Sequence, residues 1–307
     1  MRIVVGVDVS TSAEDACRFV ASRRWPTGTA VELVAAFEAP FDWTGLASPG
    51  SDAVESDRAT LEAILQERAA LLRNGGLAVT TTLEEGDPAA TITRRAEQMY
   101  AQLIVVGSRR LGPIAAAVLG SVSAHLVDHA PCPVLVARSP GATRMLLATD
   151  GTDSSRNIPY VLASWGEALR HLPVEVLSVA PQTRAFEPLH WLTPPGDAPV
   201  EGTLSQEYLQ HERIADQVAD EMMDLGWHAA AVASVGDTER EILAAADMWR
   251  ADLIVTGSRG LGAIRRHLQG SVSHGLLMHS QSSLLVVRGV VPAPLRMAAA
   301  LSTATPA

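Results

Sequence analysis

The sequence predicts an α/β fold built as two tandem copies of an open, doubly wound, parallel five-stranded sheet. The first observation is an internal repeat, because the segment Ile104–Arg138 recurs as Ile254–Arg288. The second is that each copy alternates short β-rich runs with longer helical stretches, a pattern typical of βαβ units. The third is length, because 307 residues exceed one compact domain. We predict domains at residues 1–140 and 141–290 and a mobile tail at 291–307.

The strands of the first copy are predicted from its short apolar runs. Right-handed crossovers between consecutive parallel strands produce an open sheet whose ligands bind beyond the strand carboxyl ends. The loops after the first and fourth strands should therefore meet at one cleft. The predicted strands are Ile3–Val7, Val31–Ala36, Ala78–Leu83, Leu103–Val106 and Val134–Ala137.

Apolar stripes at helical spacing predict a long helix over Ser56–Arg73 and a second over Glu207–Leu225. Such helices should cover the sheet faces. The segments Ala39–Ser56 and Pro181–Ser205 are rich in Pro, Gly and Trp, so we interpret them as variable excursions after the second strand of each copy. The stripe residues are Leu61, Ile64, Leu65, Ala69 and Leu72 in the first helix, and Leu209, Ile214, Val218, Met222 and Leu225 in the second.

Composition excludes several classes of function. The formal net charge is -10 and no basic arm is present, which disfavours nucleic acid or an anionic membrane surface as a partner. All 24 basic residues are Arg, so the Lys of a Walker A loop, of a protein kinase or of a Schiff base is missing. The apolar runs are too short for a membrane span.

The cysteines and the N-terminus favour a cytoplasmic location. Cys17 and Cys132 lie far apart and form no disulfide framework, which fits a reducing compartment. The chain enters a β-like run at once, without the features of a secretory leader. Cys132 is expected to be a packed thiol. His125 and His129 stand four residues apart on one helix, but no carboxylate completes a metal site and we predict none.

A glycine-rich pattern follows the fourth strand of the second copy, with Gly257, Gly260 and Gly270–Ser271 in the spacing G-x2-G-x9-G-S. Glycines let the backbone approach a phosphate without a Cβ clash, and the helix opened by Ser271 presents free N–H groups and a positive dipole end. The alternative is a tight strand-to-helix turn in which Ser271 only caps the helix.

With the duplicated GSR and GSVS segments, this pattern resembles the universal stress protein family, and more narrowly its ATP-binding branch, over residues 1–290. The resemblance implies a Rossmann-like, adenine nucleotide alpha-hydrolase-like fold. It also implies that Asp150 and Val179 contact the ribose or adenine end; the alternative for Asp150 is a turn residue that only caps the next helix. The remaining residues of the implied ATP site are Gly257, Arg259, Gly260, Gly262, Gly270, Ser271, Val272 and Ser273.

The first copy departs from this pattern at two positions. Arg110 replaces the second glycine, and Val9 follows Asp8 where the second copy has a glycine. Arg110 either fills the pocket or, beside Arg109, binds phosphate as a second guanidinium. Ala36 stands where the second copy has Val179. The candidate site residues of this copy are Asp8, Ala36, Gly107, Arg109, Gly112, Gly120, Ser121, Val122 and Ser123.

The resemblance implies an ATP-binding protein that regulates stress adaptation or growth through conformation or an unknown protein partner. No catalytic set stands out, so we expect binding without catalysis. Whether Mg2+ accompanies ATP stays open. The alternatives are a weak ATP hydrolase on the same site and a nucleotide-free interaction scaffold. The last strands, Val134–Ala137 and Leu284–Val287, are apolar on both faces, which predicts pseudo-twofold pairing between the two copies or in a homodimer.

Overall fold

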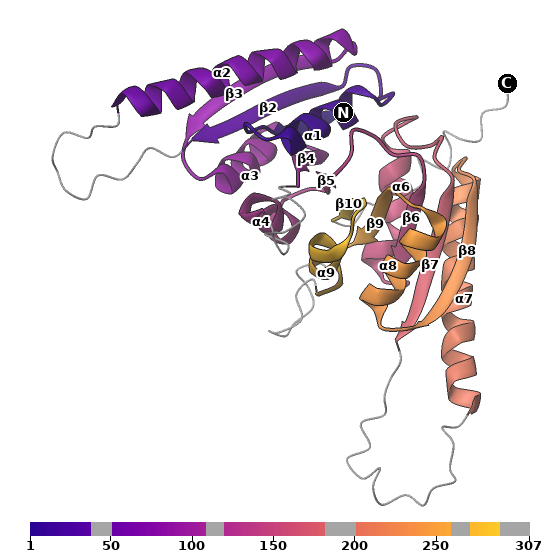
Figure 1. The fold of residues 1–307 in the computed structure, drawn as a ribbon. Coiled ribbons are helices and arrows are strands. Elements are labelled where there is room, and N and C mark those ends of the chain that lie inside the picture. The colour runs from indigo at the N-terminus through magenta and orange to yellow at the C-terminus, as the bar shows by residue number, and fades with distance from the viewer. Residues whose placement is uncertain (38–50, 109–119, 182–200, 259–270, 289–307) are drawn as a thin grey trace, which may run out of the picture.

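A single ten-stranded sheet runs through the protein in a computed structural model that describes residues 1–37, 51–108, 120–181, 201–258 and 271–288 (Figure 1). The strand order is β3-β2-β1-β4-β5-β10-β9-β6-β7-β8, so each half repeats the order third, second, first, fourth, fifth. The strands are β1 (Arg2–Gly6), β2 (Ala30–Phe37), β3 (Ala78–Glu85), β4 (Leu103–Gly107), β5 (Val134–Ala137), β6 (Met145–Thr149), β7 (Val174–Pro181), β8 (Ala229–Gly236), β9 (Leu253–Gly257) and β10 (Ser283–Val287).

The two halves join through their last strands. All pairs within a half are parallel, whereas β5 and β10 pair antiparallel with Leu135 opposite Leu285. The two predicted five-stranded sheets are therefore the two halves of one ten-stranded sheet. The physical reason is that both strands are fully buried and apolar, so each covers the backbone N–H and C=O groups that the other would leave unpaired. This is the pairing between copies expected from the sequence.

Helices cover both faces of the sheet. One apolar core joins α1, α2, α6 and α7 to one face, and the other joins α3, α4, α8 and α9 to the opposite face. Each core runs from the first half into the second. The helices are α1 (Thr11–Ala21), α2 (Ser51–Asn74), α3 (Pro88–Met99), α4 (Ser121–His129), α5 (Asp153–Arg156), α6 (Ile158–Ala163), α7 (Glu201–Asp224), α8 (Thr238–Trp249) and α9 (Ser271–His279).

The two long helices begin earlier than the sequence predicts, at Ser51 and Glu201, so the excursions before them end five or so residues sooner. The apolar stripe predicted for the first long helix, α2, is confirmed as the side of that helix that packs on the core. On α7, however, Leu209 is 45% exposed and was wrongly assigned to the core. The reason is helical geometry, because at about 100° per residue Leu209 lies on roughly the opposite side of α7 from the buried row of Val218 and Met222. The predicted tail, 291–307, lies outside the described residues.

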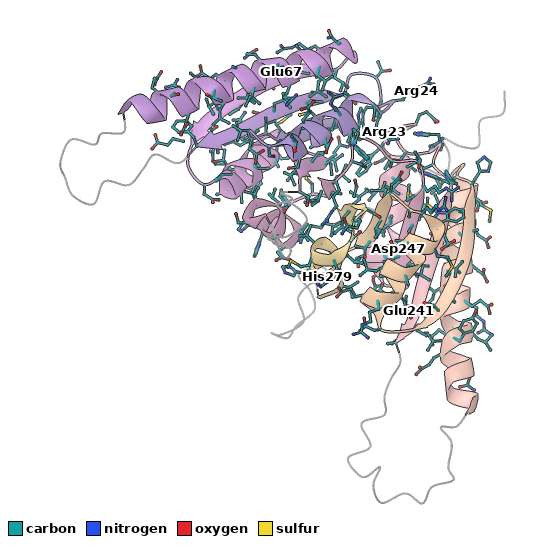
Figure 2. All side chains as sticks on the ribbon, in the orientation of Figure 1. Arg23, Arg24, Glu67, Glu241, Asp247 and His279 are labelled. Atoms are coloured by element: carbon teal, nitrogen blue, oxygen red, sulfur yellow. The ribbon has the colours of Figure 1, made fainter. Side chains whose placement is uncertain are left out.

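Two arginines of the first half bind backbone groups near the boundary between the halves. The Arg138 guanidinium donates to the carbonyl oxygens of Leu277 and Ser280, at the carboxyl end of α9. Arg23, labelled in Figure 2, donates to the carbonyl oxygen of Ala142 at 3.0 Å. The contact of Arg138 fixes α9, whose other end faces the candidate site of the second half. Every helix within the described ranges is too short or too polar to cross a lipid bilayer.

Candidate functional site

The loop after β6 forms one wall of a cavity at the carboxyl ends of the second-half strands. Asp150 Oδ1 accepts hydrogen bonds from the Thr152 backbone N–H (3.0 Å), the Thr152 hydroxyl (2.6 Å) and the Ser155 hydroxyl (2.8 Å). Gly151 has a φ of +72°, a left-handed conformation that glycine adopts without a steric penalty. The carboxylate therefore orders the turn that precedes α5, whose N-cap residue is Thr152, and it also lines the cavity.

Strand β7 supplies an apolar wall of the same cavity. Leu177 and Val179 are both buried and point to the face of the sheet that carries α8 and α9. Ile242 of α8 lines the cavity as well, and Pro181 ends the strand at its rim. Together these side chains form an apolar surface against which a flat ring system can pack.

The third wall comes from β9 and α9. Gly257 ends β9 so close to the loop of α5 that an added Cβ would lie 3.1 Å from the Ser155 backbone nitrogen. Ser271 begins α9, and Val272 and Ser273 of its first turn line the cavity. The first N–H groups of a helix have no partner within the helix, and its dipole makes this end positive. An anion at this wall would therefore find hydrogen-bond donors.

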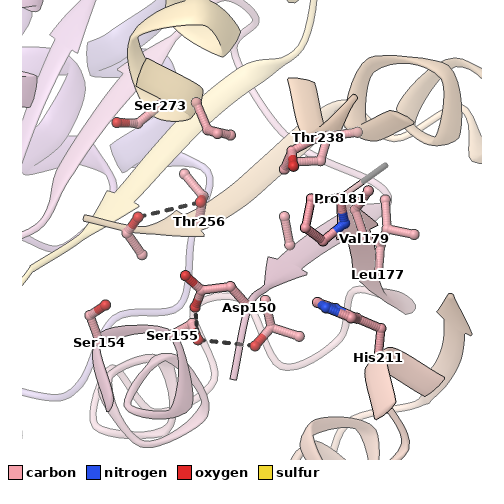
Figure 3. Close-up of a pocket in the computed structure, with 15 residues that line it drawn as sticks. Asp150, Ser154, Ser155, Leu177, Val179, Pro181, His211, Thr238, Thr256 and Ser273 are labelled. Carbon is pink, nitrogen blue, oxygen red and sulfur yellow. Dashed lines mark hydrogen bonds between the residues drawn. The ribbon is translucent and has the colours of Figure 1, made fainter. Parts of the chain in front are cut away.

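These walls enclose a cavity of about 360 Å³, shown in Figure 3. At this cavity the carboxyl ends of β6 and β9, the first and fourth strands of the second half, lie together. Among its lining residues are five that the sequence predicted for the site: Asp150, Val179, Gly257, Val272 and Ser273.

His211 of α7 also lines this cavity and was missed from the sequence. Its Nδ1 lies 2.8 Å from the Ser178 hydroxyl, which donates to the Thr149 carbonyl oxygen at 2.9 Å. Burial lowers the pKa of His211, and the nearby carboxylates of Asp150 and Glu207 oppose that shift. A signal did exist, because His211 occupies a position of the apolar stripe where the matching helix of the first half has Leu61.

The first half has a much smaller cavity at the matching place, about 100 Å³. The Asp8 carboxylate accepts from the Ser10 backbone N–H at 2.9 Å and from the Ser10 hydroxyl, again ordering the turn before a helix. Gly120 precedes α4, and the Ser123 hydroxyl donates to its carbonyl oxygen at 2.9 Å. The predicted residues that line this cavity are Asp8, Ala36, Gly107, Gly120, Ser121, Val122 and Ser123.

The rest of both phosphate loops lies outside the described residues. This applies to Arg109, Arg110 and Gly112 in the first half. In the second half it applies to Arg259, Gly260, Gly262 and Gly270.

The isolated histidines and cysteines do not form a further site in the described chain. His125 and His129 stack on each other with ring centroids 4.6 Å apart, and no group of three metal-binding side chains occurs among the described residues. Cys17 and Cys132 are buried free thiols. Burial raises the pKa of each to about 12, so both stay protonated and unreactive near neutral pH. The expectation of a packed thiol at Cys132 is confirmed.

Comparison with known proteins identifies the family. The profile of the Universal stress protein family matches residues 1–138 and again residues 141–288. The chain belongs to the universal stress protein family. The chain is 25% identical to Universal stress protein Rv2624c of Mycobacterium tuberculosis, in a match that covers 93% of this chain and 96% of that one. It is 27% identical, with the same coverage of both chains, to Universal stress protein Rv2005c of that organism.

Solved structures of this family share the fold of the entire chain. A universal stress protein from Archaeoglobus fulgidus superposes with a TM-score of 0.63 at 18% identity, covering 94% of this chain and 98% of that one. A second, from Pseudomonas aeruginosa, superposes with a TM-score of 0.61 at 19% identity, covering 99% and 98%. Two universal stress protein repeats joined in one chain are therefore an arrangement that this protein shares with its relatives.

Proposed function

We propose that this universal stress protein binds ATP in the cavity of its second half. The observation that carries the proposal is the meeting of three walls of different chemistry in that cavity. An apolar wall on β7 suits a purine ring, and the amino end of α9 suits phosphate. Asp150 lies between them, in the loop after β6. The sequence motif of the ATP-binding branch runs through the same loops.

The size of the cavity supports one nucleotide per chain. Small-molecule sites typically occupy about 300 to 1,000 Å³, and of the two matching cavities that the described residues line, the second-half one, at about 360 Å³, lies in that range. The first-half cavity, at about 100 Å³, is below it. We therefore assign the nucleotide to the second half. The chain contains no Lys, so the phosphates would be held by helix and loop N–H groups, serine hydroxyls and arginine.

The proposed role is regulation by occupancy and not catalysis. A ligand that binds one conformation more tightly shifts the protein towards it. Helix α9 is the element through which such a shift would reach the first half, because Arg138 holds its carboxyl end. An unknown partner, in a pathway of stress adaptation or growth, would then sense the altered surface.

The test is to denature purified protein, prepared without added ligand, and to quantify the released nucleotide per chain by chromatography. We expect up to one ATP per chain. Val179→Trp should abolish it, because the indole fills the apolar wall of the cavity. Val232→Trp is the matched control, since this residue lies exposed on the neighbouring strand β8 and outside the cavity.

No released nucleotide, together with no binding of added Mg-ATP at millimolar concentration, would overturn the proposal in favour of a scaffold. Phosphate release above that of buffer, lost in Val179→Trp, would replace the regulatory role with the weak hydrolase.

A further inference from the structure

The protonation of His211 follows from its hydrogen-bond partners. The carbonyl oxygen of Thr149 can only accept, so the Ser178 hydroxyl, 2.9 Å away, uses its one proton there. Ser178 Oγ must then accept from His211 Nδ1 at 2.8 Å, which places the proton of the neutral imidazole on Nδ1. The other ring nitrogen, Nε2, is left as an acceptor.

His211 is held in this form near neutral pH. Burial lowers its pKa, and the two carboxylates that face it, Asp150 and Glu207, only oppose that shift. Ser178 is fully buried, so water does not compete for its hydroxyl. Within the described residues no side chain or backbone group is hydrogen-bonded to Nε2, while the imidazole extends from α7 into the cavity (Figure 3).

The imidazole lies at the end of the cavity remote from the phosphate wall. β9 and β7 flank β6 on opposite sides, so about 10 Å separates β9, the strand before α9, from β7. His211 is hydrogen-bonded to Ser178 of β7. Ser178 and His211 lie on the α7 face of the sheet, whereas Leu177 and Val179 lie on the α8 face, and the cavity spans both faces beyond the carboxyl end of β6. A nucleotide whose phosphates lie at α9 would therefore cross the end of β6 and bring the edge of its base to His211.

We propose that His211 Nε2 accepts a hydrogen bond from the exocyclic amino group of the purine, so that His211 selects a 6-amino purine over a 6-oxo purine. This inference rests on the proposed function. An amino group donates to Nε2, whereas a 6-oxo group meets it with a second acceptor. One hydrogen bond of this kind corresponds to about tenfold in affinity.

The first half provides the design for the test. In the matching positions it has Leu61 for His211 and Ala35 for Ser178, and both are buried in its core. The double variant His211→Leu, Ser178→Ala thus replaces the polar pair with one that this fold already packs. His228→Leu is the matched control, because that histidine is exposed and lies outside the cavity.

The experiment titrates each protein with ATP and with ITP, which differ in the group at position 6 of the purine and in the hydrogen that the 6-oxo form carries on N1, by isothermal calorimetry. We expect the wild type and His228→Leu to bind ATP about tenfold more tightly than ITP, and the double variant to bind both alike. His211→Gln, which keeps an acceptor, should retain a preference for ATP. Thermal melting of each variant verifies that it folds.

The outcomes separate the two levels of inference. If the wild type binds neither nucleotide, the proposed function fails. If it binds both with equal affinity, the proposed function stands and the role of His211 is overturned, whatever the variants do. A double variant that keeps the full preference for ATP would likewise assign selectivity to other groups.

Discussion

The two halves of this universal stress protein repeat one strand order, yet their cavities differ more than threefold in volume, at about 100 and 360 Å³. The contrast is sharpest at the end of the fourth strand. A Cβ on Gly107 would lie 2.3 Å from the backbone carbon of Ser12, whereas one on Gly257 would lie 3.1 Å from its nearest neighbour. The first helix thus approaches the sheet more closely in the first half than in the second.

The sequence explains this difference in two steps. In the second half Pro159 lacks the N–H that would bond to the carbonyl of Ser155, so the helix divides into α5 and α6, whereas α1 is continuous. In addition, Gly151 takes a positive φ that Val9 does not adopt. Duplication has therefore preserved the sheet while two residues changed how the first helix meets it.

The largest change in stability is expected at the glycine that ends the fourth strand of each half, Gly107 in β4 and Gly257 in β9. We expect Gly107→Ala to lower the free energy of unfolding by about 3 kcal/mol, because its Cβ meets backbone atoms that cannot rotate away. Gly257→Ala should lower it by about 1 kcal/mol or less. Chemical denaturation of both variants measures the difference. Equal losses would show that the two halves are packed alike at this point and would break the comparison.

A buried ion pair distinguishes the halves on the helical face of α3 and α8. Glu32 on β2 is paired with Arg95 of α3 and accepts from the Thr82 hydroxyl at 2.6 Å. Glu32→Gln should lower the free energy of unfolding by about 2 kcal/mol, because it removes the buried countercharge of Arg95 and leaves its guanidinium only the Glu84 carboxylate at 4.0 Å. The change is read from the denaturation midpoint, and a loss near zero would contradict the importance of this pair.

The matching carboxylate of the second half should behave in the opposite way. At the positions of Arg95 and Thr82 the second half has the uncharged residues Ala245 and Val232, and burial raises the pKa of Glu175. Glu175→Gln should therefore raise the free energy of unfolding at about pH 7, by less than about 1 kcal/mol because solvent screens this partly exposed group.

The pH dependence of this gain has a defined sign. A raised folded pKa means that ionisation is penalised in the folded state, so wild-type Glu175 contributes stability that is present below its unfolded pKa and lost as the pH rises through its folded pKa. The benefit of Glu175→Gln should thus shrink from about pH 7 to about pH 4. Melting temperatures of both proteins at the two values test it, and a gain independent of pH would point to packing instead.

Much of the fold followed from the sequence because buried parallel strands are short apolar runs. The predicted strand Val134–Ala137 has the bounds of β5, and the others agree to within about two residues. The loops that line the cavity were also predictable, since the strand order fixes where they meet. Leu209 was wrong because it lies on roughly the opposite side of α7 from the buried row of Val218 and Met222.

His211 shows what the sequence could not supply for the site. A histidine within an apolar stripe is ordinarily a core residue whose ring nitrogens are hydrogen-bonded inside the protein. The contact of His211 with Ser178, 33 residues away, is what indicates a binding role, and it is not visible in the sequence. Neither the volume of the two cavities nor the proximity of α1 to Gly107 can be predicted from a local sequence pattern. Both depend on how helix and strand pack after the chain has folded.

The antiparallel pair of β5 and β10 has a consequence for synthesis of the chain. β5 leaves the ribosome about 150 residues before β10, which at roughly 5 to 20 residues per second is a delay on the order of ten seconds. During that interval the first repeat can complete its own five strands but has an apolar edge uncovered. Nascent chains on neighbouring ribosomes would present identical edges, so pairing between them competes with the correct pairing until the second repeat is finished.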